Sequence, residues 1–214
     1  MRLRTVLLVC GLASSLIYVL AIDLLAPIAH PEYHNYRYQM VSELFAVGAP
    51  TRAVLGLPMA LYNVLVLAFA VGVWVSAKGR GAIRLIAVAL ATYGIISSMG
   101  FFVAPMDVRG PEGLTERDVR HILGTALQGI ALVSALVLGG FVLGRRFRTY
   151  SFATLGICVV FGALAGVFAA QEASPWLGMA ERVSIYAWMG WVAVFAIALL
   201  RSMDLGRVGG ESIS

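Results

Sequence analysis

The sequence predicts an all-α membrane protein, a polytopic bundle of six transmembrane helices. The first observation is composition: of 214 residues, 60% are hydrophobic and 13% are charged, whereas soluble domains carry about 25% charged residues. The second is that six apolar windows are long enough to cross a bilayer, which takes roughly 20 residues each. The third is that the segments between these windows differ in their number of basic residues, with more of them on one side of the membrane than on the other. The windows cover residues 5–27, 53–77, 81–104, 121–144, 152–170 and 182–201.

The first window follows the basic sequence Met1-Arg-Leu-Arg, which could open a signal peptide. However, its apolar stretch, residues 5–22, exceeds the usual length of about 7–15 residues for the apolar core of a signal peptide, and no small-x-small cleavage site follows. We therefore expect a retained first helix. Residues 1–204 are expected to form a single transmembrane domain, and residues 205–214 a flexible cytoplasmic tail.

The basic residues predict the orientation of the six helices. With the N-terminus inside, ten of the 16 Lys and Arg residues fall on the inner side and six on the outer side. The two short inner loops are almost purely basic, and inner loops are where Lys and Arg concentrate in membrane proteins. Both termini are therefore expected in the cytoplasm, with the chain in a bacterial inner membrane.

Two outer connections are longer than a simple turn, at residues 28–52 and 105–120. Within the first, residues 40–47 are apolar but too few to span a bilayer, which predicts a short interfacial helix between the first and second spans. Within the second, Thr115-Glu-Arg-Asp has the pattern of a helix start, with Thr115 as the N-cap. Connections of this length tend to be functional when they are ordered.

Composition also excludes some functions. The net charge is +5, but no basic helix or block of Lys and Arg exists that could follow a nucleic-acid backbone. The two cysteines, Cys10 and Cys158, lie inside apolar windows and are expected to be buried thiols without a disulfide. The expected partners are membrane lipids, with a homo-oligomer left open and no nucleic acid.

All three histidines, His30, His34 and His121, fall on the outer side, where Asp107 also lies. Histidines and a carboxylate with one open position are how proteins hold a catalytic zinc ion, and such an ion would activate water for hydrolysis. The other interpretation is that these residues are ordinary polar groups at the level of the lipid head groups. Because no H-E-x-x-H motif is present, we expect no cofactor, with zinc held by His34, Asp107 and His121 as the alternative.

Polar side chains inside the windows, such as Asn63 and Gln128, must find partners in hydrocarbon and are expected to hydrogen-bond between helices. The pairs Gly140-x-x-x-Gly144 and Gly162-x-x-x-Gly166 predict close contacts of the fourth and fifth helices.

Several short motifs point to a known family. Residues 42–50 read Ser-Glu-Leu-Phe-Ala-Val-Gly-Ala-Pro, and Asn63 lies in the helix that follows. Residues 101–107 read Phe-Phe-Val-Ala-Pro-Met-Asp, with His121 further on. In these features the chain resembles the bacterial membrane family catalogued as domain of unknown function 998. The resemblance implies a six-helix architecture and nominates Ser42, Pro50, Asn63, Asp107 and His121, but supplies no reaction.

A second likeness is to the seven-helix membrane hydrolases related to alkaline ceramidases, which hold zinc with histidines and an aspartate. This chain lacks their Ser-x-x-x-His pattern and has no histidine on its last helices. The predicted function is binding of a lipid or amphipathic small molecule at the periplasmic face, with Ser42, Asn63, Asp107 and His121 as ligand-binding residues. The alternatives are a metal-dependent lipid hydrolase, with Asp107 and His121 as catalytic candidates, and a structural or accessory subunit.

Overall fold

The chain folds into long helices, as the composition predicts. The computed structural model describes residues 2–33, 35–108, 113–169 and 174–208, and side chains from residue 3 to residue 202 within these ranges. Within them the only pairing of extended backbone is a single bridge. Six helices are long and apolar enough to cross a membrane. The elements are α1 (Arg2–Leu20), η1 (Ala21–Leu25), α2 (Ala26–Ala29), η2 (Ser42–Phe45), α3 (Thr51–Ser76), α4 (Gly81–Phe102), α5 (Glu116–Gly139), α6 (Arg145–Ala169) and α7 (Leu177–Val208).

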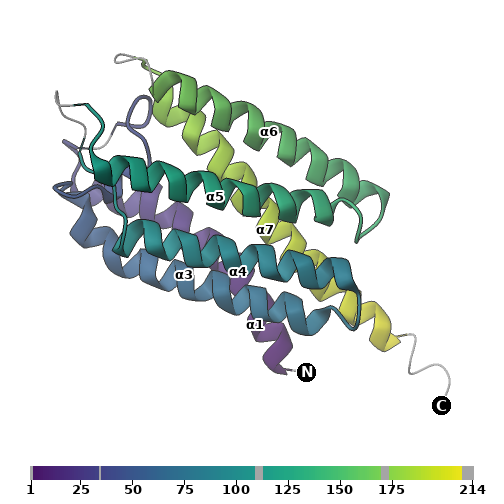
Figure 1. Cartoon of the computed structure of the whole chain (residues 1–214). Helices are drawn as coiled ribbons and strands as arrows, with labels where there is room; N and C mark the ends of the chain where they lie inside the picture. Colours follow the sequence, from purple (N-terminus) through teal and green to yellow (C-terminus); the bar gives the residue numbers. More distant parts are fainter. Residues whose placement is uncertain (1, 34, 109–112, 170–173, 209–214) are drawn as a thin grey trace.

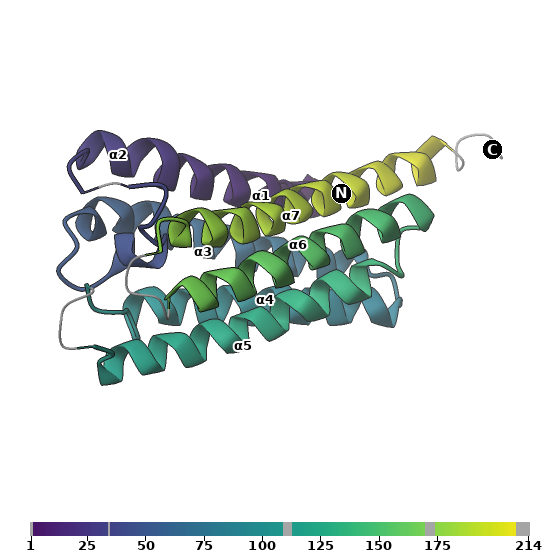
Figure 2. The ribbon, with the colours of Figure 1, turned by 90° about the horizontal axis from the view of Figure 1, so that it is seen from above.

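The long helices run side by side along one axis (Figures 1 and 2). Each packs against the next in chain order, and α7 also packs against α1, so the helices form a closed ring. Both chain ends lie at the same end of the bundle (Figure 1), as an even number of crossings requires. Which side of the membrane that end faces stays a prediction.

The interior of the ring is filled largely by aromatic side chains of α7. Trp188, Trp191 and Phe195 lie on one face at helical spacing and are at most 1% exposed. The rings of Trp191 and Phe195 stack with centroids 4.9 Å apart, and Trp191 Nε1 donates to Ser151 Oγ on α6 at 2.9 Å. A buried indole N–H needs such an acceptor, so this contact ties α6 to α7.

The first span changes geometry near its end. A π-helical turn, η1, connects α1 to α2, and Pro27 follows it inside α2. Proline has no N–H to donate to the carbonyl four residues earlier, which is that of Asp23. The Tyr36 hydroxyl donates to this carbonyl instead, at 2.9 Å.

Two connections cover the end of the bundle opposite the chain termini (Figure 1). We call them the cap, which consists of the described residues 30–33 and 35–50 of the first connection and 103–108 and 113–115 of the second. The two connections pair through the bridge between Val47 and Asp107, in which Val47 N donates to Met106 O at 2.8 Å. The 3₁₀ turn η2 lies inside the stretch predicted as an interfacial helix. Its Leu44 is fully buried against the bundle, and its position relative to a membrane surface stays a prediction.

Several helix boundaries differ from the sequence prediction. Both α6 and α7 begin before the predicted windows, because Arg145 and Glu181 are charged residues within the helices. α7 continues to Val208, past the predicted end of the last window, and the remainder of the predicted tail, 209–214, lies outside the described residues. Conversely, α4 ends at Phe102, so Asp107 lies in the cap and not at a helix end.

Candidate functional site

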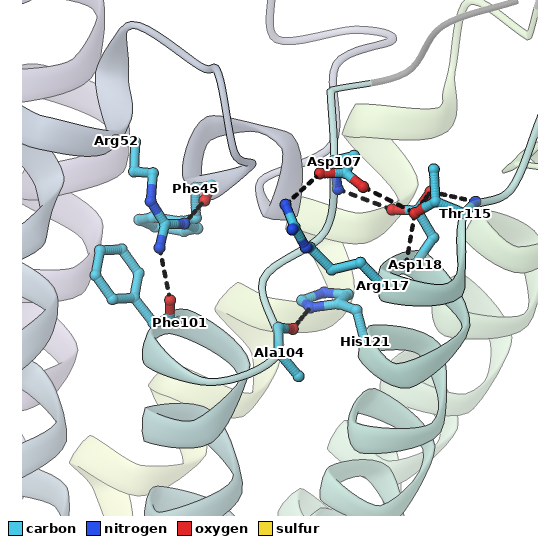
Figure 3. Close-up of polar contacts among 9 residues, drawn as sticks. All are labelled: Phe45, Arg52, Phe101, Ala104, Asp107, Thr115, Arg117, Asp118 and His121. Carbon is cyan, nitrogen blue, oxygen red and sulfur yellow. Dashed lines mark hydrogen bonds and ion pairs between the residues drawn. The ribbon is translucent and has the colours of Figure 1, made fainter. Parts of the chain in front are cut away.

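The cap end contains a set of polar side chains that we call the Asp107 network. Hydrogen bonds link four of them, Asp107, Thr115, Arg117 and Asp118, and the fifth, His121, lies one turn beyond Arg117 on α5. They come from the 103–115 connection and the first turns of α5, and Figure 3 shows them facing one another. Asp107 Oδ1 pairs with Arg117 Nη1 at 2.7 Å, and Thr115 Oγ1 donates to Asp107 Oδ2 at 2.8 Å. The Asp107 N–H donates to Asp118 Oδ1, also at 2.8 Å.

The start of α5 explains why these residues meet. Thr115 is the N-cap, as the sequence predicts, and forms a reciprocal capping box with Asp118. Asp118 is only 8% exposed, because its two carboxylate oxygens accept from the backbone of both Asp107 and Thr115. Free N–H groups at a helix start favour such a carboxylate. Asp118 therefore fixes the connection to α5 and holds Asp107 beside it.

His121 lies one turn further along α5. Its Nδ1 is 3.1 Å from the carbonyl oxygen of Ala104 (Figure 3). A carbonyl oxygen only accepts, so Nδ1 carries the proton and Nε2 is left with its lone pair. The ring is half-buried, and no hydrogen bond joins Nε2 to another residue of the described chain. His121 can therefore offer one nitrogen to a bound molecule.

Arg52, at the start of α3, joins the first connection of the cap to the end of α4. Its guanidinium donates to the carbonyl oxygens of Phe45 and Phe101, the latter at 2.9 Å, and stacks on the Phe101 ring at 4.8 Å (Figure 3). Bonding to two carbonyls at once suits the planar fork of an arginine. These contacts hold η2 beside the end of α4.

A second polar cluster attaches the cap to α7, and the sequence analysis did not identify it. Arg182 Nη1 donates to the carbonyl oxygens of Gln39 at 2.7 Å and Tyr36 at 3.2 Å. Glu181 accepts from the N–H of Val41. The backbone of the cap approaches so closely that a Cβ at Gly178 would collide with the Gln39 carbonyl oxygen. We call Glu181 and Arg182 the α7 latch.

Arg182 is the most deeply buried charged side chain of this region. It is 2% exposed, and its Nε and Nη2 atoms have no hydrogen-bond partner within the described part of the chain. Ionisable groups buried in a membrane span are costly and mark functional or structural sites. The sequence placed Arg182 at the outer edge of the last window, because a Glu-Arg pair at the start of an apolar run also fits a loop. The glycine four residues earlier is the one signal that indicates close backbone packing.

Asp23, in η1, contacts both the cap and α7. Its Oδ1 accepts from the Tyr186 hydroxyl of α7 at 2.6 Å. The Tyr36 hydroxyl bonds the Asp23 carbonyl, and burial raises the pKa of the Tyr36 phenol, which keeps it protonated as a donor. Asp23 thus links the end of the first span to the last span.

The other residues nominated by the sequence lie apart from the Asp107 network. Ser42 is in η2, next to the latch contact at Val41, and is half-buried. Asn63 is in α3, 4% exposed, with no partner for its Oδ1 among the described residues; it lies 12 residues beyond Thr51, roughly 18 Å along the helix. The structure therefore brings Asp107 and His121 into one region and leaves Ser42 and Asn63 outside it.

The zinc alternative requires three side chains that are free to bind a metal ion. Asp107 has both carboxylate oxygens engaged by Arg117 and Thr115, and His121 offers one nitrogen. The described residues contain no group of three or more His, Cys, Asp or Glu side chains placed to hold a metal ion. His34, the third ligand of the prediction, lies outside the described residues, while His30 caps α2 and pairs with Glu32 at 3.3 Å. The described residues alone therefore do not supply a complete set of zinc ligands, and zinc binding stays a prediction.

Comparisons with known proteins bear on the family and not on the activity. Comparison with curated proteins found no match, and neither did comparison with solved structures. The model of one family, described as protein of unknown function (DUF998), matches residues 12–198. This match runs from α1 to α7 and includes the cap, the Asp107 network and the α7 latch. On that coverage, the chain belongs to the DUF998 family and, with its six membrane-spanning helices, is an integral membrane protein.

Proposed function

We propose that this protein binds a lipid or another amphipathic small molecule at the cap end of the bundle, facing the periplasm. Arg117 and His121 contact the polar end of the bound molecule, and Asp107 orients Arg117. Its apolar part lies along the outer faces of α5 and α6.

The observation that carries the proposal is the free hydrogen-bonding capacity at the edge of the Asp107 network. Arg117 has five N–H donors, and its side chain is 45% exposed. Among the described residues its guanidinium pairs with Asp107 alone, through Nη1. His121 adds one free ring nitrogen. A phosphate, carboxylate or hydroxyl group would satisfy both residues together, since charge-assisted hydrogen bonds to such oxygens are the stronger kind.

Apolar surface continues directly from this polar edge. Phe102 and Val103 end α4 beside the network and are more than half exposed. On α5, Ile122 and Ile130 are exposed two turns apart and no described segment covers them. A polar group next to an apolar face is the arrangement that an amphipathic molecule needs, because it keeps the head in the interface and the chain in hydrocarbon.

The test is the amount of lipid that co-purifies with the protein in a mild detergent, measured by mass spectrometry after solvent extraction. Arg117→Gln should lower the bound lipid roughly tenfold, because one charge-assisted hydrogen bond contributes about 1.5–3 kcal/mol. His121→Ala should also lower it. Arg120→Gln is the matched control, since it removes the same charge three residues along α5 from an exposed pair with Glu116.

Equal lipid content in Arg117→Gln, Arg120→Gln and the unmodified protein would overturn the proposal. The accessory-subunit alternative would then be favoured.

A further inference from the structure

A groove lies at the other end of the bundle, where both termini, the turn between α3 and α4, and the turn between α5 and α6 are found (Figure 1). It has a volume of about 430 Å³, within the roughly 300–1,000 Å³ typical of small-ligand sites. It runs between the start of α6 and the last turns of α7. The lining residues are Leu143, Arg146, Phe147, Tyr150, Val194, Ala198, Arg201 and Ser202.

The lining is divided by chemistry. Arg146, at the first turn of α6, and Arg201, at the end of the α7 span, supply two guanidinium groups. Leu143, Val194 and Ala198 supply aliphatic side chains. One ligand that fills this groove must therefore combine an anionic group with a hydrocarbon part.

The two arginines are available to such a ligand. Both side chains are exposed, and neither makes a hydrogen bond or ion pair with a described side chain. Other cations of this end are engaged: Arg148 Nε donates to Gly140 O at 3.1 Å, and Arg84 stacks on Trp74. The groove therefore has two guanidinium groups that are not engaged by any side chain of the described residues.

The expected depth of the groove in the bilayer indicates which class of ligand it could bind. The α6 span begins at Arg145 and the α7 span ends at Ser202, so the guanidiniums lie at the height of the lipid head groups. Val194, about two turns before Arg201 on α7, is then expected at the height of the acyl chains. Basic pockets between helices at a membrane surface bind anionic lipid head groups.

We propose that this groove binds one anionic glycerophospholipid, with its phosphate against Arg146 and Arg201 and its first acyl carbons against Val194 and Ala198. The two positive charges favour a head group with net negative charge over a zwitterionic one. This site is separate from the one at the cap end, and each can fail without the other.

The experiment is native mass spectrometry of the whole protein, released from a neutral detergent after titration with phosphatidylglycerol or with phosphatidylcholine of the same acyl chains. We expect one phosphatidylglycerol molecule to bind in addition to any lipid retained at the cap end, at concentrations where phosphatidylcholine forms little of the same adduct. Arg146→Gln with Arg201→Gln should weaken the phosphatidylglycerol adduct roughly 30-fold, because each surface cation contributes about a fivefold preference.

The matched control is Arg145→Gln, which removes the same charge from the neighbouring position of α6, outside the groove lining. It should leave the adduct within about twofold of the unmodified protein. Ala198→Trp keeps both arginines and fills the apolar part, and it should also abolish the adduct. Helical circular dichroism and the gel-filtration profile establish that each variant is folded.

Three results would overturn the proposal. One is equal binding of phosphatidylcholine and phosphatidylglycerol; another is an equal loss in Arg145→Gln and in the double variant. The third is competition by free glycerol phosphate at concentrations similar to that of the lipid, which would identify a water-soluble anion as the ligand. Arg117→Gln should leave this adduct unchanged, so that failure at the cap end and failure at the groove are distinguishable.

Discussion

At the scale of single residues, the most consequential side chain is Arg182. One guanidinium nitrogen bonds the carbonyls of Tyr36, Gln39 and Gly178, while the ring of Tyr36 lies 5.0 Å from its centre. A lysine at this position would keep the charge but lose the planar group that stacks on an aromatic ring and reaches several acceptors.

Arg182→Lys should therefore loosen the cap without unfolding the bundle. We expect trypsin to cleave after Arg37, an exposed residue of the cap, roughly tenfold faster in the variant, because local opening controls proteolysis. The measurement is the rate of appearance of the 38–214 fragment in detergent. Arg120→Lys, a change at an exposed ion pair, is the control, and equal rates in the two variants would refute the latch.

Residue-scale reasoning from the sequence found part of the site. Asp107 and His121 were nominated, and the fold brings them together because Asp118 holds the connection to the start of α5. Arg182 was missed, because its burial depends on a backbone segment more than 140 residues earlier in the chain. Apart from Gly178, no local feature of the sequence indicates this close approach.

At the scale of elements, the start of α5 determines the geometry of the Asp107 network. The Thr115 hydroxyl is the side-chain acceptor of the helix cap and also contacts Asp107. Its loss affects two elements at once, the helix and the connection before it.

Thr115→Ala should lower the free energy of unfolding by about 1–2 kcal/mol, as removal of an N-cap usually does. The measurement is thermal unfolding in detergent, followed by circular dichroism. Thr125→Ala is the control on the same helix, because its exposed hydroxyl bonds only the His121 carbonyl one turn back. Equal midpoints for Thr115→Ala and the unmodified protein would contradict this role of the cap.

Hydropathy predicted all six spans, because about 20 consecutive apolar residues leave few other solutions. The ends of the spans were less predictable. The capping pattern at Thr115 located the start of α5. By contrast, α6 begins with arginines and α7 has Glu181 and Arg182 in its second turn, and hydropathy excludes such charged residues from a span. Whether a charge lies on a loop or inside a helix depends on its neighbours in the fold.

At the scale of the whole molecule, the unequal distribution of basic residues predicts the orientation. The turn between α3 and α4 and the turn between α5 and α6 lie at the end with the chain termini, and the cap lies at the other end (Figure 1). In a bacterial inner membrane, the end rich in Lys and Arg is expected in the cytoplasm.

Single cysteines test this orientation. In a variant with Cys10 and Cys158 replaced by alanine, Glu32→Cys and Leu114→Cys should react with a membrane-impermeant maleimide on intact cells. Lys78→Cys should react only after permeabilisation. The side chain of Glu32 is 69% exposed and Leu114 is 74% exposed, so access should not limit labelling. Labelling of Lys78→Cys on intact cells would show that the orientation is the opposite of the predicted one.

The contact between the first and last spans has a consequence for biosynthesis. Ser15 of α1 donates to the Met189 carbonyl of α7 at 3.0 Å, and Asp23 accepts a hydrogen bond from Tyr186 of the same helix. The ring therefore closes only when the final helix leaves the ribosome. Until then, the nascent chain holds polar groups in the bilayer without their partners, so we expect it to remain with the insertion machinery. A product truncated before α7 should be removed by membrane proteases.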